Sequence, residues 1–245
     1  MKKILILATT ATLLFSCKKN DDKAGTFSGP EASIYQGKGK SWVKLDGNGS
    51  VQQLGVTIDD AAMNSLPTIG SGTEVTLALN LEAKTATPFD HIEVGWNPLG
   101  HEPSGIYDKP HFDFHFYTVP ESEVKGATDN VKLNANPAAD YLPQNYVPGP
   151  PVPQMGKHFI DVTSPELNGQ PFTQTFLFGT YDAKVTFYEP MITLAFLKAT
   201  TTFERSIPQS AKFKKAGYYP TKMSITKHDG VTDIILDGFV QRQAT

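Results

Sequence analysis

The 245-residue sequence contains one cysteine, Cys17, and few segments with helical periodicity. With a single thiol, the chain can form neither an internal disulfide nor a metal site built from several thiolates. Its most apolar run, residues 4–15, is shorter than the roughly 20 residues that a membrane-spanning helix needs. A basic patch is also missing: without residues 1–16 the chain has 20 basic and 25 acidic residues. Nucleic acid is therefore not an expected partner.

Motifs of several enzyme classes are also missing. The sequence has no Gly-Xaa-Ser-Xaa-Gly nucleophile elbow, no serine or cysteine beside a histidine in a nucleophile motif, and no phosphate-binding glycine loop. Paired carboxylates for glycoside hydrolysis stay open, because their separation depends on tertiary structure. The sequence does not decide whether the protein is an enzyme.

The amino terminus is typical of an exported protein. Lys2 and Lys3 precede the apolar run, which has the length of a signal-peptide core. Leu14-Phe15-Ser16-Cys17 resembles a bacterial lipobox, and this resemblance implies cleavage before Cys17 and lipidation of its thiol. The alternative is an ordinary signal peptide with an incidental cysteine.

Residues 18–23, Lys-Lys-Asn-Asp-Asp-Lys, resemble the charged tether that follows the lipidated cysteine in lipoproteins of Bacteroidetes-type bacteria. We therefore expect a signal peptide over residues 1–16, a lipidated cysteine with a flexible tether over residues 17–30, and one all-β domain over residues 31–245. The membrane is the expected partner through this lipid. The expected location is the cell envelope, at the periplasmic or surface face of the outer membrane.

Short alternating segments with turn residues between them predict an all-β sandwich or barrel-like domain with few short helices. Residues 41–46 and 51–58 read as a hairpin around Gly-Asn-Gly, and Asp59 or Asp60 caps one short helix that ends before Pro67. The segment 172–199 reads as strands throughout, and residues 127–154 as a long Pro/Asn-rich loop.

The segment Pro-His-Phe-Asp-Phe-His-Phe-Tyr, residues 110–117, carries the sharpest functional signal. On a strand, successive side chains point to opposite faces, so His111, Asp113 and His115 share one face and the phenylalanines between them share the other. The phenylalanine face predicts a core contact. The polar face predicts either a site or a hydrogen-bonded layer.

Imidazole and carboxylate ligands suit Zn, Mn or Fe. The candidate metal ligands are His111, Asp113, His115, His158 and Glu189, with His101 as a further site candidate. Positions i and i+2 of a strand lie about 6.6 Å apart, and i and i+4 about 13 Å, so His111 and His115 cannot share one ion on a straight strand. The most economical site combines Asp113 with one of these histidines and adds His158 and Glu189.

For the histidines outside the metal-ligand set, the sequence favours other roles. His101 lies in a Gly- and Pro-rich turn, where stabilising the turn is its expected role. His91 and His228 are expected at the surface or at strand ends.

Four segments resemble an uncharacterised family of secreted bacterial all-β proteins with a Thermus representative. They are the turn Gly-His-Glu-Pro, the strand Pro-His-Phe-Asp-Phe-His-Phe-Tyr, Met-Gly-Lys-His and Tyr-Glu-Pro-Met, all within residues 96–193. The resemblance implies an all-β fold and marks the six candidate residues above as family positions, but it implies no activity.

The sequence thus predicts an envelope-anchored lipoprotein of unknown activity whose His/Asp/Glu site binds a divalent metal or a small polar ligand. The alternative is a non-catalytic structural or interaction module, with homo-oligomerisation as one form, whose polar strand face is a hydrogen-bonded core or an interface.

Overall fold

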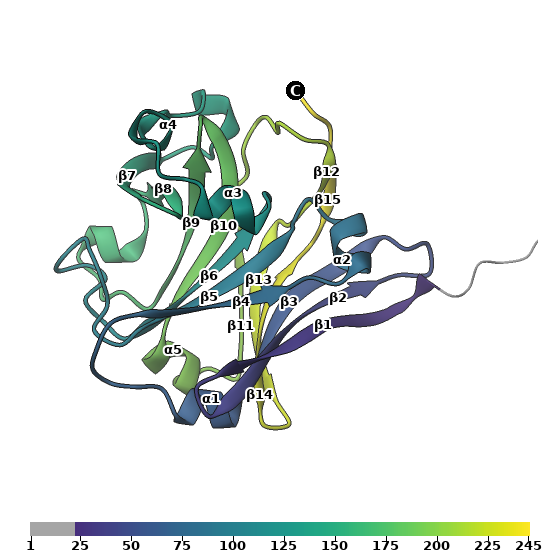
Figure 1. Cartoon of the computed structure of the whole chain (residues 1–245), viewed down its shortest axis with the longest axis vertical. Coiled ribbons are helices and arrows are strands. Elements are labelled where there is room, and N and C mark those ends of the chain that lie inside the picture. Colours follow the sequence, from purple (N-terminus) through teal and green to yellow (C-terminus); the bar gives the residue numbers. More distant parts are fainter. Residues whose placement is uncertain (1–22) are drawn as a thin grey trace, which may run out of the picture.

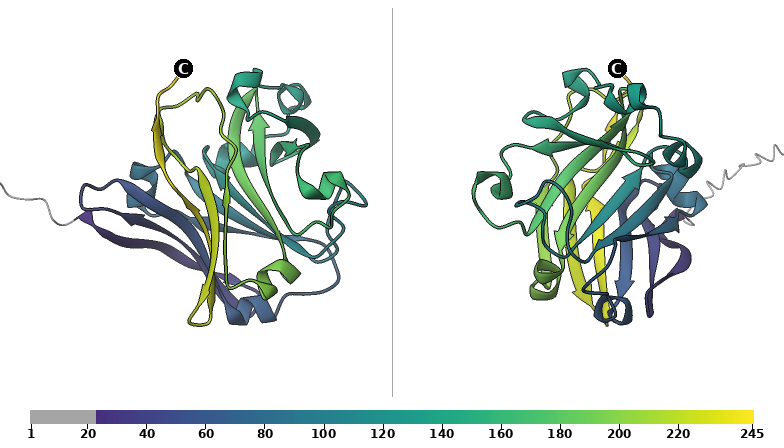
Figure 2. Two further views of the ribbon diagram at one scale, coloured as in Figure 1. Left: turned by 180° about the vertical axis from the view of Figure 1, so that it is seen from behind. Right: turned by 60° about the vertical axis from the view of Figure 1, so that its left-hand side comes forward.

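Two antiparallel sheets face each other in the computed structural model, which describes residues 23–245 (Figures 1 and 2). The predicted signal peptide and Cys17 lie outside the described residues. Within residues 23–245 the strands form a six-stranded sheet, a seven-stranded sheet and a short two-stranded sheet. The prediction of an all-β, sandwich-like fold is confirmed.

The six-stranded sheet brings strands from both ends of the described chain together. Its order is β1 (Gly25–Ile34), β2 (Gly37–Leu45), β3 (Val51–Asp59), β14 (Val231–Asp237), β13 (Lys222–His228) and β11 (Thr202–Ser206). The predicted hairpin is confirmed as β2 and β3. Between β13 and β14, Asp229 and Gly230 both have positive φ, as a tight hairpin turn requires.

The seven-stranded sheet holds the polar segment near its centre. Its order is β4 (Thr73–Ala78), β5 (His91–Asn97), β6 (His111–Tyr117), β10 (Lys184–Thr193), β9 (Gln174–Tyr181), β8 (Gly156–Asp161) and β7 (Tyr146–Val152). The two-stranded sheet pairs β12 (Gly217–Tyr219) with β15 (Val240–Arg242).

The helices of the described chain are short. They are α1 (Asp60–Asn64), α2 (Leu81–Ala86), α3 (Glu121–Lys125), α4 (Asn130–Asn134), α5 (Leu194–Ala199) and the 3-10 turns η2 (Ala139–Tyr141) and η3 (Pro165–Asn168). Of the two predicted caps, Asp59 is the one that caps α1, since its side chain accepts from the backbone N–H of Ala62. Within residues 23–245, a helix with the length and apolar character to cross a bilayer is not found.

The main apolar core lies between the two large sheets. Leu54, Val56 and Ile234 of the six-stranded sheet face Phe114 and Phe178 of the other, and all five side chains are buried. The phenylalanine face of β6 therefore packs in the core, as the alternation predicts.

Three expectations differ from the structure. Residues 25–30 are not tether: they belong to β1, where Phe27 packs against the core. The predicted loop 127–154 contains α4, η2 and β7, and β7 carries three prolines because an edge strand tolerates missing N–H donors. Residues 194–199 form α5 rather than strand, because Thr193 caps a helix at the end of β10.

Candidate metal centre

The two faces of β6 differ in chemistry but not in burial. Its phenylalanines point into the core, whereas His111, Asp113 and His115 lie on the opposite face and are also buried. Two small apolar clusters, one around Tyr107 and one around Val124, cover this opposite face. The polar face of β6 is therefore a buried layer rather than a solvated surface.

Six residues of this layer form two groups. The first triad is His101, His111 and Asp113, and the second triad is His115, His158 and Glu189. Within each triad, one nitrogen or oxygen atom from every residue lies within 4.8 Å of the others. All candidate residues are thus brought together, but in two sites instead of the single predicted one.

Strand geometry and register explain this division. As predicted, the extended strand keeps His111 and His115 apart, and Asp113 joins only the first of them. The register that pairs Tyr188 with Phe116 and Met191 with Asp113 places Glu189 across from His115. His158 and Glu189 therefore join His115. The sequence predicts them in one site with Asp113, and the structure corrects this.

The loop between β5 and β6 folds back to deliver His101. Gly100 has a φ of 73°, and a Cβ there would lie 2.0 Å from the carbonyl oxygen of Tyr107. Only glycine fits this close approach. The backbone N–H of His101 then donates to that same carbonyl, which fixes the imidazole over the end of β6.

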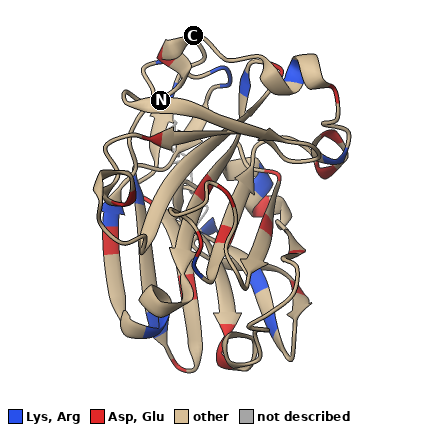
Figure 3. Cartoon of the chain, turned by 90° about the vertical axis from the view of Figure 1, so that its left-hand side faces the viewer, with Lys and Arg blue, Asp and Glu red and all other residues tan. Residues whose placement is uncertain are grey.

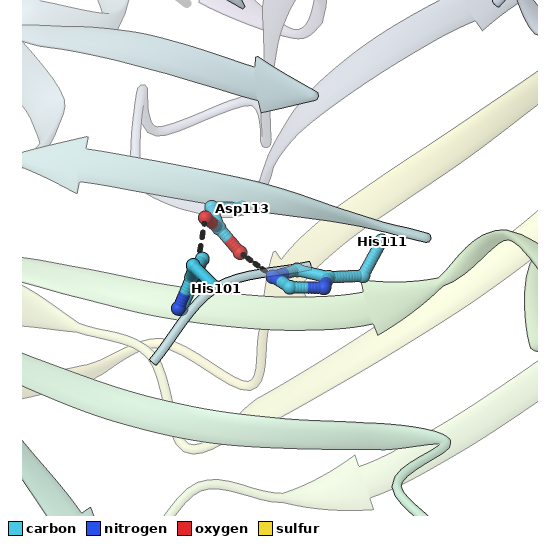
Figure 4. Close-up of side chains that lie close together, drawn as sticks. All are labelled: His101, His111 and Asp113. Atoms are coloured by element: carbon cyan, nitrogen blue, oxygen red, sulfur yellow. Dashed lines mark hydrogen bonds and ion pairs between the residues drawn. The ribbon is translucent and has the colours of Figure 1, made fainter. Parts of the chain in front are cut away.

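The first triad places both imidazoles around one carboxylate (Figure 4). His111 Nε2 lies 3.1 Å from Asp113 Oδ1, and His101 Nε2 lies 3.3 Å from Asp113 Oδ2. The two imidazole rings meet edge to face with centroids 4.7 Å apart. Within the described chain, His111 Nε2 and Asp113 Oδ1 are buried without a hydrogen-bond partner in good geometry.

Hydrogen bonds outside the first triad fix its ring orientations. His111 Nδ1 lies 2.6 Å from the carbonyl oxygen of Lys109, and His101 Nδ1 lies 2.7 Å from that of Glu102. A carbonyl oxygen can only accept, so each Nδ1 carries a proton and donates it. The side-chain amide of Asn97 donates to Asp113 Oδ2 at 2.7 Å. In the neutral imidazoles, both Nε2 lone pairs therefore face the carboxylate.

Electrostatics keep the carboxylate of the first triad ionised. Burial raises the pKa of Asp113, but the imidazoles of His111 and His101 outweigh it and hold that pKa below its ordinary value. Burial likewise lowers the pKa of His101, but Asp113 and the Glu102 carbonyl raise it to about 9. Without a metal, a proton on His101 is thus the charge that balances Asp113.

The second triad draws on three strands, with His115 on β6, His158 on β8 and Glu189 on β10. His115 Nε2 lies 3.4 Å from Glu189 Oε1, and His158 Nε2 lies 3.4 Å from Glu189 Oε2. Burial lowers the pKa of His115, but Glu189 raises it to about 9; burial lowers the pKa of His158.

A cavity of about 510 Å³ adjoins both triads. His101 and Asp113 line it from the first triad, and His158 lines it from the second. Much of its wall is apolar, with Tyr107 and Leu177 among the lining residues. Its size falls within the roughly 300–1,000 Å³ typical of small-molecule pockets.

Two polar residues of this layer were not among the predicted site residues. Asn97 and Glu93 lie on β5, directly across from His111 and His115, and burial raises the pKa of Glu93. The sequence contains a pattern that could have identified these two residues, because polar residues alternate along residues 91–97 as they do in β6. His91 was expected at the surface or at a strand end. It begins β5, which is a strand end, but it is buried and stacks on Tyr117.

These features define a class of protein: an all-β sandwich in which one sheet carries a buried layer of imidazole and carboxylate side chains. The family model described as TTHB210-like, hypothetical protein TTHB210, matches residues 46–96 and supports similarity to an uncharacterised Thermus-type family. This stretch ends at Trp96, before the triads and before all four motifs that suggested the family. The chain matches no curated protein and no solved structure.

Proposed function

We propose that this protein is an envelope lipoprotein that binds a divalent metal ion at the first triad. The observation that carries the proposal is the donation of both Nδ1 protons to backbone carbonyls. This arrangement turns two Nε2 lone pairs toward the Asp113 carboxylate. Two neutral imidazole nitrogens and a carboxylate that point at one another repel unless a cation lies among them, either a metal ion or the proton that His101 holds in its absence. Metal-ligating histidines commonly donate their other N–H in this way.

The spacing of the ligand atoms supports a metal. With bonds of about 2.0–2.1 Å, ligand atoms of a tetrahedral zinc site lie about 3.3–3.4 Å apart. In the first triad, each imidazole nitrogen lies at a distance close to this value, 3.1 and 3.3 Å, from a different oxygen of Asp113. Charge-assisted hydrogen bonds are shorter, at about 2.7–2.9 Å.

Two imidazoles and one carboxylate suit Zn, Mn or Fe and leave coordination positions open. His101 and Asp113 face the cavity, so a small ligand in it would reach those open positions. Glu74 and Glu102 lie on the cavity wall, and the described lining includes neither lysine nor arginine. A small polar ligand without net negative charge fits this wall.

A hydrogen-bonded structural layer is the rival function, and one observation favours it. The pKa of about 9 for His101 supports an imidazolium paired with Asp113 at neutral pH. In that case the polar face belongs to a structural or interaction module. Metal content separates the two functions, because the structural layer needs none.

The test is elemental analysis by plasma mass spectrometry on the full chain, purified without a polyhistidine tag. The comparison is between the wild type and Asp113→Asn, which keeps the shape of the side chain and removes its charge. His228→Gln, outside both triads, is the control. The proposal predicts metal that Asp113→Asn loses and the control keeps. Equal metal content in Asp113→Asn and the wild type, after incubation with Zn, Mn and Fe salts, refutes it.

The lipid anchor rests on residues 1–22 and is a separate part of the proposal. Because β1 begins at Gly25, a lipidated Cys17 would be followed by a tether of residues 18–24. At about 3.5 Å per residue this tether reaches about 25 Å at most, which would hold the fold close to the membrane. Fractionation of Cys17→Ala tests this: the variant should leave the membrane fraction, and its retention there would refute the anchor.

A further inference from the structure

We infer that His115, His158 and Glu189 hold a divalent metal ion of their own, separate from the ion proposed at the first triad. The three side chains project from neighbouring or nearby strands of one sheet, β6, β10 and β8. The site is therefore built on rigid elements rather than loops. It offers two imidazoles and a carboxylate, the donor set that suits Zn, Mn or Fe.

The geometry of the second triad fits a metal. Glu189 directs Oε1 at His115 and Oε2 at His158, each at 3.4 Å from Nε2. Each separation, to a different oxygen of the carboxylate, is close to the roughly 3.4 Å between two ligand atoms of a zinc ion and exceeds the length of a charge-assisted hydrogen bond. One nitrogen or oxygen atom of each residue lies within 4.8 Å of the others. The carboxylate thus lies between the two imidazoles without bonding closely to either.

Burial makes this arrangement costly without a cation. The side chains of His115 and Glu189 are each 1% exposed, and that of His158 is 14% exposed. Within residues 23–245, both ring nitrogens of His115 and Oε2 of Glu189 are buried without a hydrogen-bond partner. Buried polar groups are almost always satisfied, and a buried carboxylate needs a partner. A divalent ion among the three residues supplies it for His115 Nε2 and Glu189 Oε2.

The two ions would occupy separate sites rather than one two-metal centre. Among the histidines of residues 23–245, Asp113 pairs with none outside the first triad, and Glu189 pairs with none outside the second. His158 lines the same cavity as His101 and Asp113, so a ligand in it has access to both sites.

The experiment counts ions per chain. Full-length protein is stripped with a chelator, reloaded with Zn²⁺, freed of excess ion and analysed by plasma mass spectrometry. We expect two zinc ions in the wild type and in His228→Gln. We expect one in Glu189→Gln, one in His158→Gln and one in Asp113→Asn. The double variant Asp113→Asn/Glu189→Gln should hold none.

The variants separate the failure of this inference from the failure of the proposed function. If Glu189→Gln and His158→Gln keep as much zinc as the wild type, the second site does not exist, whatever Asp113→Asn does. If only these two variants lose zinc, the second site stands and the proposed site at the first triad fails.

Glu189 is buried, so two further measurements distinguish loss of the second site in Glu189→Gln from loss of folding. His158→Gln changes the least buried member of the triad, and near-ultraviolet circular dichroism of each variant reports whether the fold is kept. Titration of the stripped wild type with Co²⁺, followed by visible absorbance, should reach its end point at two equivalents. An end point at one equivalent, with the remaining ion lost in folded Asp113→Asn, overturns the inference.

Discussion

The two triads have the same composition, two histidines and one carboxylate, but the protein orients them by different means. In the first triad, hydrogen bonds to the carbonyls of Lys109 and Glu102 and from Asn97 fix every side chain. In the second, the ring of Phe187 packs against both imidazoles, with centroid distances of 5.0 Å to His115 and 5.2 Å to His158.

This difference follows from where each triad lies. His101 comes from a loop and is 39% exposed, so backbone carbonyls of that loop and of the strand entrance are available as partners. His115 lies in the middle of a central strand, where neighbouring backbone groups are used by the sheet ladder. Hydrogen bonds orient the ligands at the start of β6, and packing against Phe187 orients those at its middle.

The largest expected effect comes from the core side of β6 and affects both triads. Phe114→Ala removes a fully buried ring behind the strand and should destabilise the fold by about 3–5 kcal/mol. Chemical denaturation measures this change. Because β6 supplies ligands to both triads, zinc affinity should fall at both. A loss confined to one triad would contradict the picture of a shared rigid strand.

Gly179→Ala should damage only the second triad. A Cβ at Gly179 would lie 1.8 Å from the ring of Phe187, which is buried and cannot move away freely. We expect destabilisation by about 1–3 kcal/mol and displacement of the ring that orients His115 and His158. Zinc counting should show loss of the second-triad ion alone.

Gly47→Ala is the matched control for this prediction, since a Cβ at Gly47 meets no atom within 4 Å. It should leave stability and both ions unchanged. If Gly179→Ala behaves like Gly47→Ala, aromatic packing does not position the second triad.

Asn97→Ala is the corresponding change for the first triad. It removes the donor to Asp113 Oδ2 and leaves all three ligands in place. Loss of such an outer partner typically weakens metal binding about 10- to 100-fold. Competition with a chromophoric chelator measures the affinity, and the ion at the second triad provides the internal reference. Equal weakening at both triads would mean that Asn97 acts through the fold.

The smallest expected effect lies outside both triads, at His228. Hydrogen bonds to Asp233 and Asp229 raise the pKa of His228 above its ordinary value. A raised folded-state pKa stabilises the fold below the unfolded pKa of about 6.5, and the contribution is lost as pH rises through the folded value. The wild type should therefore exceed His228→Gln slightly in stability below about pH 6, and the difference should vanish at alkaline pH. A stability difference that grows with pH would contradict this prediction, because it would mean that folding lowers the pKa of His228.

Much of the fold could be predicted because local chemistry decided it. Alternation in β2, β3 and β6, the Asp59 cap and the Asp229-Gly230 turn all act within a few residues. The errors arose where tertiary context took over. Residues 194–199 are as apolar as a strand but lie past the end of the sheet, and the prolines of β7 suit a strand only because β7 is an edge.

The candidate site divides in the same way. The two-residue period of a strand by itself determined that His111, Asp113 and His115 share a face opposite the phenylalanines, and that the two histidines cannot reach one ion. Only the tertiary structure decided which partners complete each site. The register of β10 against β6 sends Glu189 to His115, and the fold of the loop after β5 sends His101 to Asp113. Side-chain direction along a strand is a local property of the backbone, whereas a contact between distant segments depends on sheet register and loop path, which no short stretch of sequence contains.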